Sequence, residues 1–271
     1  KKLPFYVIKH IFTLKYLIIS RKSITFAHSF RFKRFVHMAA RGKYDKGNIA
    51  KLIAKLWGGI ADDQFELLKE HLEIKKYKKN EIIYKNEGTP EHALCLISGK
   101  VKIYKEGIGG KSQIIRVIKP IEFFGFRAYF ADEIYKTAAM SLENCVIAQF
   151  PLAVLMKLLS KSFNIGFFFI KYLSVEIGKS DDRTVNLTQK HIRARLAEGL
   201  MFLKDSYGVE KDGKTLDIRL SREDLANLCN MTTSNAIRTL SAFTAEELIK
   251  TEGRKIKILQ EEEIIKIAEL G

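Results

Sequence analysis

The 271-residue sequence predicts an α+β fold in which a β-barrel or sandwich is followed by one long helix and a C-terminal winged helix. Three observations predict this order. Short apolar runs separated by turn residues recur between about Leu72 and Pro151, and a heptad-like apolar pattern follows Pro151. Near the C-terminus, two short helical patterns with a tight turn precede a hairpin signal. The length suits two modest domains better than one.

The net charge of +16 lies mostly in an N-terminal segment. Residues 1–44 contain 11 Lys and Arg and no acidic residue, whereas residues 188–271 hold 14 of each sign. Charged residues interrupt the apolar stretch within residues 1–37 before it reaches a membrane-spanning length. We expect residues 1–46 to be a basic extension outside the functional fold, and a basic amphipathic helix at a membrane surface is the alternative.

Residues 47–160 are predicted to form the β-domain with its flanking helices. A helical pattern from Ile49 to Glu73 is divided by the pair Gly58-Gly59. Strand-like runs then recur at short intervals, which is typical of an antiparallel barrel or sandwich. The predicted strands are Glu81–Tyr84, Ala93–Ile97, Val101–Tyr104, Ile114–Ile118, Ala138–Leu142 and Val146–Phe150.

Residues 161–187 are predicted to form a long helix that joins two copies of the chain. Apolar or small residues repeat there with alternating spacings of three and four, which is typical of a coiled-coil seam. A helix packed only on its own domain is the alternative. Because Phe167, Phe168 and Phe169 also need burial, we expect one side to face the β-domain and the other a partner copy. The predicted seam is Phe163, Gly166, Ile170, Leu173, Ile177, Ser180, Thr184 and Leu187.

Residues 188–271 contain the most specific pattern. Ser221 opens a capping box that starts a first helix, which runs to Cys229 with Leu225 and Leu228 facing inward. Asn230 follows at a point where a sharp turn needs positive φ, a conformation that Asn tolerates.

A second helix should begin at a cap provided by Thr232 or Thr233 and bury Ala236, Ile237 and Leu240. Two short helices with a tight turn form a helix-turn-helix unit. The segments Leu248–Lys250 and Lys255–Ile258 flank Glu252-Gly253-Arg254, which predicts a hairpin. The two features together predict a winged helix.

With these elements in place, the chain resembles the cyclic-AMP receptor protein/FNR (Crp/Fnr) family of transcription regulators. The runs NEGTPEHALCLISGKVKIYKEG and LSREDLANLCNMTTSNAIRTLSAF carry the resemblance, which covers about Gly47 to the end. It implies a jelly-roll sensor called a β-roll, similar to cyclic-nucleotide-binding domains, a dimerisation helix, and a cytoplasmic homodimer that binds double-stranded DNA. It also implies RNA polymerase as a partner and a small-molecule effector in the β-roll. A two-fold dimer with two reading helices predicts an inverted-repeat operator.

The resemblance places DNA reading on the N-terminal half of the second helix, which should enter the major groove. Arg238 matches a family arginine that pairs with guanine. Thr233 and Ser234 stand where cyclic-AMP regulators have Arg and Glu, so the target sequence does not carry over. The candidate base-reading residues are Thr232, Thr233, Ser234, Asn235 and Arg238, and the candidate phosphate contacts are Thr188, Ser221, Arg254 and Lys255.

The run FFGFRAYFADEIYKTAA resembles the family's phosphate-binding cassette. Phe126 stands where the family has the Glu that binds the ribose hydroxyl. Lys136 stands where the family has the Arg that pairs with the phosphate, and lysine keeps the charge but cannot form two parallel hydrogen bonds. Asp181, in the adenine-reading pair, adds negative charge near an anionic ligand. Cyclic AMP is therefore disfavoured, and the effector is unknown. The candidate effector contacts are Gly125, Phe126, Arg127, Lys136, Thr137, Ala138, Ser180 and Asp181.

The three cysteines, Cys95, Cys145 and Cys229, are widely spaced. Their spacing predicts reduced core thiols, and it gives neither a disulfide framework nor the cysteine cluster that FNR-type iron–sulfur sensing needs. His71 and His92 are candidate haem ligands, although an isolated histidine is more often structural. We expect no metal site.

Enzyme motifs are missing from the sequence: it has no P-loop, nucleophile elbow or paired catalytic carboxylates. The histidines do not cluster as they do in metal-dependent jelly-roll enzymes. We therefore expect a protein that is not an enzyme. The rival interpretation is a cyclic-nucleotide-binding-like signalling module at a membrane surface, in which a C-terminal winged helix would be surplus.

Overall fold

The computed structural model describes residues 45–107, 110 and 112–270. The expected basic extension therefore lies almost entirely outside the described residues. The first described elements are helices α2 (Lys46–Leu56) and α3 (Asp62–His71), which confirm the helical pattern read from the sequence. Gly58 and Gly59 separate them, and both have positive φ, which explains why the helix breaks there.

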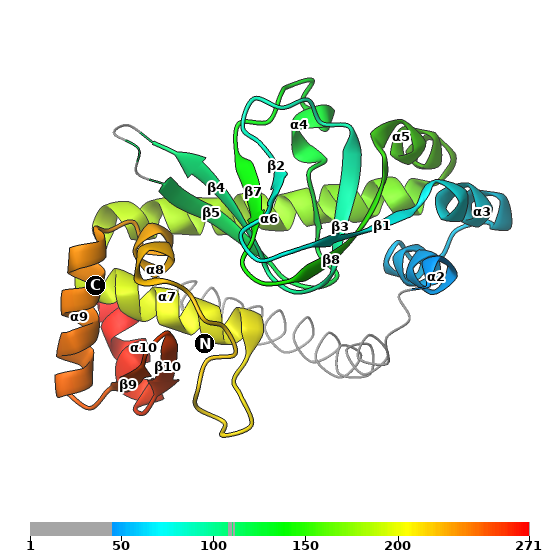
Figure 1. The fold of residues 1–271 in the computed structure, drawn as a ribbon. Coiled ribbons are helices and arrows are strands. Elements are labelled where there is room, and N and C mark those ends of the chain that lie inside the picture. Colours follow the sequence, from blue (N-terminus) through cyan, green and yellow to red (C-terminus); the bar gives the residue numbers. More distant parts are fainter. Residues whose placement is uncertain (1–44, 108–109, 111, 271) are drawn as a thin grey trace, which may run out of the picture. The chain divides into compact units, whose positions relative to one another are not determined.

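Eight strands form two four-stranded antiparallel sheets. One sheet has the order β1-β8-β3-β6 and the other β2-β7-β4-β5, so strands distant in sequence pair as in a jelly roll (Figure 1). A short helix, α4, spans Arg127–Phe130 between β6 and β7. The strands are β1 (Glu73–Tyr77), β2 (Ile82–Tyr84), β3 (His92–Ser98), β4 (Val101–Glu106), β5 (Ser112–Ile118), β6 (Phe123–Phe124), β7 (Ala138–Ser141) and β8 (Cys145–Pro151).

The core of this β-roll is built from the inward side chains of both sheets. Leu94, Leu96 and Ile147 from the first sheet pack with Val101 and Ile118 from the second. Each of the three cysteines is buried and free, as predicted. Burial raises the pKa of Cys145 to about 11 and that of Cys229 to about 12, so both thiols stay protonated at neutral pH.

Two helices follow the β-roll: α5 (Leu152–Lys161) and the 27-residue α6 (Phe163–Gln189). Ile165 and Phe169 of α6 are buried, whereas a stripe along its other side is exposed. No single helix among the described residues is long and apolar enough to cross a membrane; α5 and α6 meet that criterion only as a pair, and the pair is bent by 116°.

The exposed stripe on α6 differs in register from the predicted seam. Phe163, Ile170 and Ile177 are exposed, as the seam requires, but Leu173 and Leu187 are half-buried. The exposed fractions are 80% for Phe163, 61% for Ile170 and 62% for Ile177. The helix twists 100° per residue, so a strict 3–4 alternation drifts around a straight helix. The outward face therefore takes in Phe167 and Val185 instead.

The C-terminal part is a winged helix, as predicted. Its helices are α7 (Ile192–Tyr207), α8 (Arg222–Leu228) and α9 (Thr233–Ala245), its hairpin is β9 (Ile249–Glu252) with β10 (Lys255–Ile258), and α10 (Glu261–Leu270) follows. Helix α10 packs on α7 through Ile264 and Ala268, and Lys204 of α7 forms an ion pair with Glu261. The three acidic residues Glu261, Glu262 and Glu263 lie in the first turn of α10 and not on α9.

Candidate nucleic-acid interface

The turn between α8 and α9 is built by local polar contacts. Ser221 caps α8 by accepting a hydrogen bond from the Asp224 backbone N–H, and its hydroxyl donates to the Asp224 carboxylate at 2.8 Å. Asn230 adopts a φ of 50°, as the sequence predicted, and its carbonyl accepts from Arg195 of α7 at 2.7 Å. Arg195 thereby ties the turn to α7.

Helix α9 begins at Thr232, whose hydroxyl accepts from the Asn235 backbone N–H at 3.2 Å. Ala236, Leu240 and Phe243 are buried and fix the inward side of the helix. The N-terminal half of α9 therefore presents its other side to solvent, with Thr232, Thr233, Ser234 and Arg238 exposed and Asn235 half-buried. The structure thus brings all five predicted base-reading residues to one end of one helix.

Arg238 is held in position by its own helix. Its guanidinium Nη2 donates to the Asn235 side-chain oxygen at 2.8 Å, across one helical turn. This contact limits the freedom of the arginine and leaves other guanidinium N–H groups for a ligand, since Arg carries five donors. Two parallel donors on one plane match the O6 and N7 acceptors of guanine.

The prediction that Ile237 is buried is wrong. Its side chain is 47% exposed, because it lies 100° around the helix from Ala236 and outside the arc that packs on the core. It lines an open groove of about 420 Å³ between α9 and β9, together with Ser241, Thr244 and Thr251. The sequence did not distinguish Ile237 from the buried positions of the helix, because Ile237 is as apolar as they are.

Arg222 also lines this groove, and it is a candidate contact that the sequence analysis did not name. Its Nη2 donates to the Gly253 carbonyl in the β9–β10 turn at 2.8 Å, which joins α8 to the wing. Its Nη1 is buried without a hydrogen-bond partner among the described residues. A buried guanidinium nitrogen without a partner favours an anionic group nearby.

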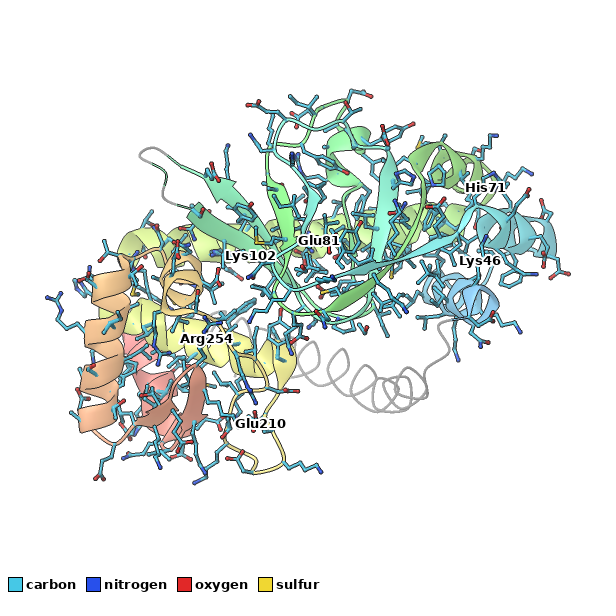
Figure 2. The ribbon with its side chains drawn as sticks, in the orientation of Figure 1. Lys46, His71, Glu81, Lys102, Glu210 and Arg254 are labelled. Atoms are coloured by element: carbon cyan, nitrogen blue, oxygen red, sulfur yellow. The ribbon has the colours of Figure 1, made fainter. Side chains whose placement is uncertain are left out.

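The four predicted phosphate contacts lie on different elements. Arg254 is exposed in the wing turn, where Figure 2 labels it, and Lys255 pairs with Glu210 at 3.4 Å. Ser221 caps α8. Thr188 lies in the last turn of α6, outside the helix-turn-helix, and its hydroxyl donates to the Thr184 carbonyl.

In the β-roll, the cassette residues surround a glycine turn. Gly125 has a φ of 80°, and a Cβ there would lie 3.0 Å from the Leu94 side chain, so a larger residue would be both strained and crowded. The Tyr135 hydroxyl donates to the Gly125 carbonyl at 3.0 Å. Phe126 is 2% exposed and packs on Phe169 of α6 with ring centroids 4.9 Å apart. Its side chain thus belongs to an aromatic core and offers no hydrogen-bonding group to a ribose.

The two cassette cations share one carboxylate. Lys136 Nζ lies 2.6 Å from Glu133 Oε1, and Arg127 lies 3.5 Å from Glu133 Oε2. The hydrogen bond from Lys136 lowers the pKa of Glu133. Thr137 is half-buried and Ala138 is buried, whereas Ser180 and Asp181 are exposed on α6.

A polar cluster that sequence reasoning missed connects β5 to α6. Arg116 Nε lies 2.8 Å from the Glu176 carboxylate, and Arg116 Nη2 donates to the Tyr172 hydroxyl at 2.8 Å. Tyr172 in turn donates to the Phe123 carbonyl at 2.8 Å. The cluster anchors α6 to the side of the β-roll that carries the cassette.

The β-roll also contacts the winged helix directly. Lys102 of β4, labelled in Figure 2, forms an ion pair with Asp224 of α8 at 2.5 Å, and Gln113 of β5 donates to the Asn227 carbonyl at 2.7 Å. Arg183 of α6 donates both to the Ile114 carbonyl of β5 and to the Leu228 carbonyl of α8. Ile114 joins the hydrophobic core of the winged helix. The β-roll and the winged helix therefore share a packed, hydrogen-bonded interface.

Among the described residues, no group of three or more His, Cys, Asp or Glu side chains is arranged to hold a metal ion. The two candidate haem ligands make ordinary contacts. His71 Nδ1 lies 3.0 Å from the Leu67 carbonyl at the end of α3, and His92 lies 4.0 Å from Glu91 at the start of β3.

Comparison with known proteins follows the same division of the chain. The family model of the cyclic nucleotide-binding domain matches residues 74–162, and that of the Crp-like helix-turn-helix domain matches residues 194–267. The chain is 26% identical over 192 residues to the anaerobic regulatory protein of Bacillus subtilis, which covers 70% of this chain and 81% of that protein. It is 23% identical over 211 residues to the fumarate and nitrate reduction regulatory protein of Vibrio cholerae, which covers 77% and 84%.

A solved structure, that of FixK2 from Bradyrhizobium japonicum, has the same fold. The TM-score is 0.66 at 19% identity, and the match covers 72% of this chain and 96% of FixK2. Further matched relatives are described as transcriptional activators or regulators, and not as enzymes. A cyclic nucleotide-binding domain, a long helix and a Crp-like helix-turn-helix in this order show that the chain belongs to the Crp/Fnr family of transcription regulators.

Proposed function

We propose that the protein binds DNA as a homodimer, with α9 of each copy in the major groove of one half of an inverted repeat. The exposed N-terminal half of α9 supports this proposal above all, because a rigid, capped helix presents Arg238 and hydroxyl side chains away from its own core. Arg222 supplies positive charge in the groove beside that helix, and Arg254 and Lys255 of the wing are further candidate phosphate contacts. The site of action is then the cytoplasm, with RNA polymerase as the partner.

The partner copy is proposed to pack on the outward face of α6. Phe163, Phe167, Ile170 and Ile177 are exposed there as one stripe, which is larger than isolated surface residues would give. Two such helices pack side by side in a two-fold dimer. That arrangement presents two copies of α9 about one DNA turn apart.

An effector in the β-roll is proposed to act through α6 and the shared interface with α8. The cassette contacts α6 through Phe126 and Phe169, and α6 contacts α8 through Arg183. Effector binding would therefore shift the position of α8 and α9 relative to the dimer axis. The effector differs from cyclic AMP in its contacts, because Phe126 is buried and Glu133 neutralises part of the charge of Arg127 and Lys136.

The test is selection of bound duplexes from a random DNA pool, followed by titration of the enriched site. Arg238→Ala should lose ~1–3 kcal/mol of binding free energy, concentrated at one base pair per half-site. Arg219→Ala is the matched control, since Arg219 is an exposed arginine of the same domain that pairs with Glu210. A loss that is uniform across sequences would make Arg238 a phosphate anchor, and no enriched duplex at all would refute the proposal.

A further inference from the structure

The outward face of α9 carries one apolar side chain among polar ones. Ser234, Ile237, Arg238 and Ser241 occupy positions i, i+3, i+4 and i+7, so they are neighbours on one strip of the helix. All four are exposed. Three of them carry hydrogen-bonding groups, and Ile237 carries none.

The fold does not need Ile237 in this place. The inward side of α9 is already filled by Ala236, Leu240 and Phe243, each of which is buried. Ile237 instead borders the groove between α9 and β9, opposite Thr251 of the wing. A single exposed apolar residue is common on protein surfaces, but this one lies next to the arginine that we place against a base.

The chemistry of the major groove limits what Ile237 can recognise. The base edges there present hydrogen-bond donors and acceptors, and the one apolar group is the C5-methyl of thymine. A β-branched side chain has few rotamers in a helix, so Ile237 holds its methyl groups in a fixed direction. The hydrogen bond from Arg238 to Asn235 holds the arginine in place on the same helix. The spacing between the Ile237 and Arg238 side chains is therefore set.

We propose that Ile237 reads the methyl group of a thymine adjacent to the base pair read by Arg238. The inference rests on the proposed function, since it requires α9 to lie in the major groove. It adds a specificity-determining residue to the interface and predicts a thymine beside a guanine in each half-site.

The test uses the full chain and the duplex enriched from the random pool. Each thymine of the half-site is replaced in turn by deoxyuridine, which removes the methyl group and keeps every hydrogen-bonding atom. Wild-type protein should lose affinity by about fourfold at one position per half-site, the change expected for one buried methyl-sized group. Ile237→Ala should bind the thymine and deoxyuridine duplexes at that position equally, and Ile237→Val should lie between the two.

Ile82→Ala is the control, because Ile82 is an isoleucine of similar exposure, 43%, on β2 of the β-roll. It should keep the wild-type ratio between thymine and deoxyuridine. The inference is overturned if wild-type protein is indifferent to deoxyuridine at every thymine, if the selected half-site has no thymine beside the guanine, or if Ile237→Ala keeps the wild-type ratio. In those cases specific binding persists and the proposed function stands. A pool that yields no enriched duplex overturns both.

Discussion

Replacement of Lys102 by Met removes the cation from an ion pair that joins the β-roll to the winged helix. Lys102 Nζ lies 2.5 Å from the Asp224 carboxylate, and the two side chains are 15% and 18% exposed. The methionine keeps most of the aliphatic volume. The substitution therefore isolates the charge from the packing.

The expected cost follows from the environment of the carboxylate that remains. Asp224 keeps its hydrogen bond from Ser221 but loses the one cation that pairs with it among the described residues, and it stays largely out of water. Loss of one partner from a fully buried pair costs ~3–5 kcal/mol, whereas an exposed pair contributes ~0–1 kcal/mol. At this degree of burial we expect Lys102→Met to lower the free energy of unfolding by about 2–3 kcal/mol.

The assay is a double-mutant cycle with Asp224→Asn in urea. Circular dichroism follows the helices, and the fluorescence of Trp57, the one tryptophan of the sequence, follows the β-roll. The double variant should be more stable than the sum of the single changes predicts, by at least about 1 kcal/mol, because residues in direct contact are coupled.

Lys69→Met serves as the control, since Lys69 and Glu66 form an exposed pair within α3 and should show almost no effect. Additive single variants in the cycle would refute the reasoning. The Lys102–Asp224 contact would then contribute nothing to the interface between the β-roll and the winged helix.

Three further predictions concern the proposed dimer face, a half-buried carboxyl and the thiols. Ile170→Asp, on the exposed stripe of α6, should shift the protein to monomers in sedimentation equilibrium, whereas Asp182→Asn on the same helix should not. A dimer that Ile170→Asp leaves unchanged would exclude this stripe as the dimer interface. Burial raises the pKa of Glu122, so its contribution to stability is lost as pH rises through the folded-state value. Glu122→Gln should therefore gain stability relative to wild type as the pH rises above about 4, the ordinary pKa of a glutamate, and a constant difference in urea titrations would contradict this. The three cysteines are buried and their pKa values are raised. A thiol reagent at pH 8 should therefore label none of them in the native protein and all three in urea. Fast labelling of the native protein would contradict this burial.

Local sequence signals predicted the helix-turn-helix and the hairpin of the winged helix, whereas α7 and α10 were not predicted. Ser221, Asn230 and Thr232 act through their own backbone neighbours, so their roles in caps and turns can be inferred without knowledge of the rest of the fold. The longer apolar strands, such as β3 and β8, were predicted from their local apolar patterns, whereas the two-residue β6 was not. The strand β1 was missed because Glu73–Tyr77 is mostly polar and pairs with β8 through its backbone.

Features that depend on distant contacts were not predicted. The sequence does not show that Lys102 meets Asp224, or that Arg116 meets Glu176, because residues far apart in the chain form each pair. Ile237 was assigned to the core because hydrophobicity does not state which side of a helix faces inward. Burial of Phe126 likewise depends on its contact with Phe169 of α6, a residue far away in the sequence. This burial removes the Phe126 side chain from the surface that an effector could contact.

The stoichiometry of the complex with DNA tests the central claim most directly. Sedimentation equilibrium of the full chain with a duplex that carries the selected inverted repeat should give two chains per duplex, and a duplex with one half-site destroyed should bind at least tenfold more weakly. A single chain per duplex at saturation, or equal affinity for the intact and half-destroyed sites, would contradict the account.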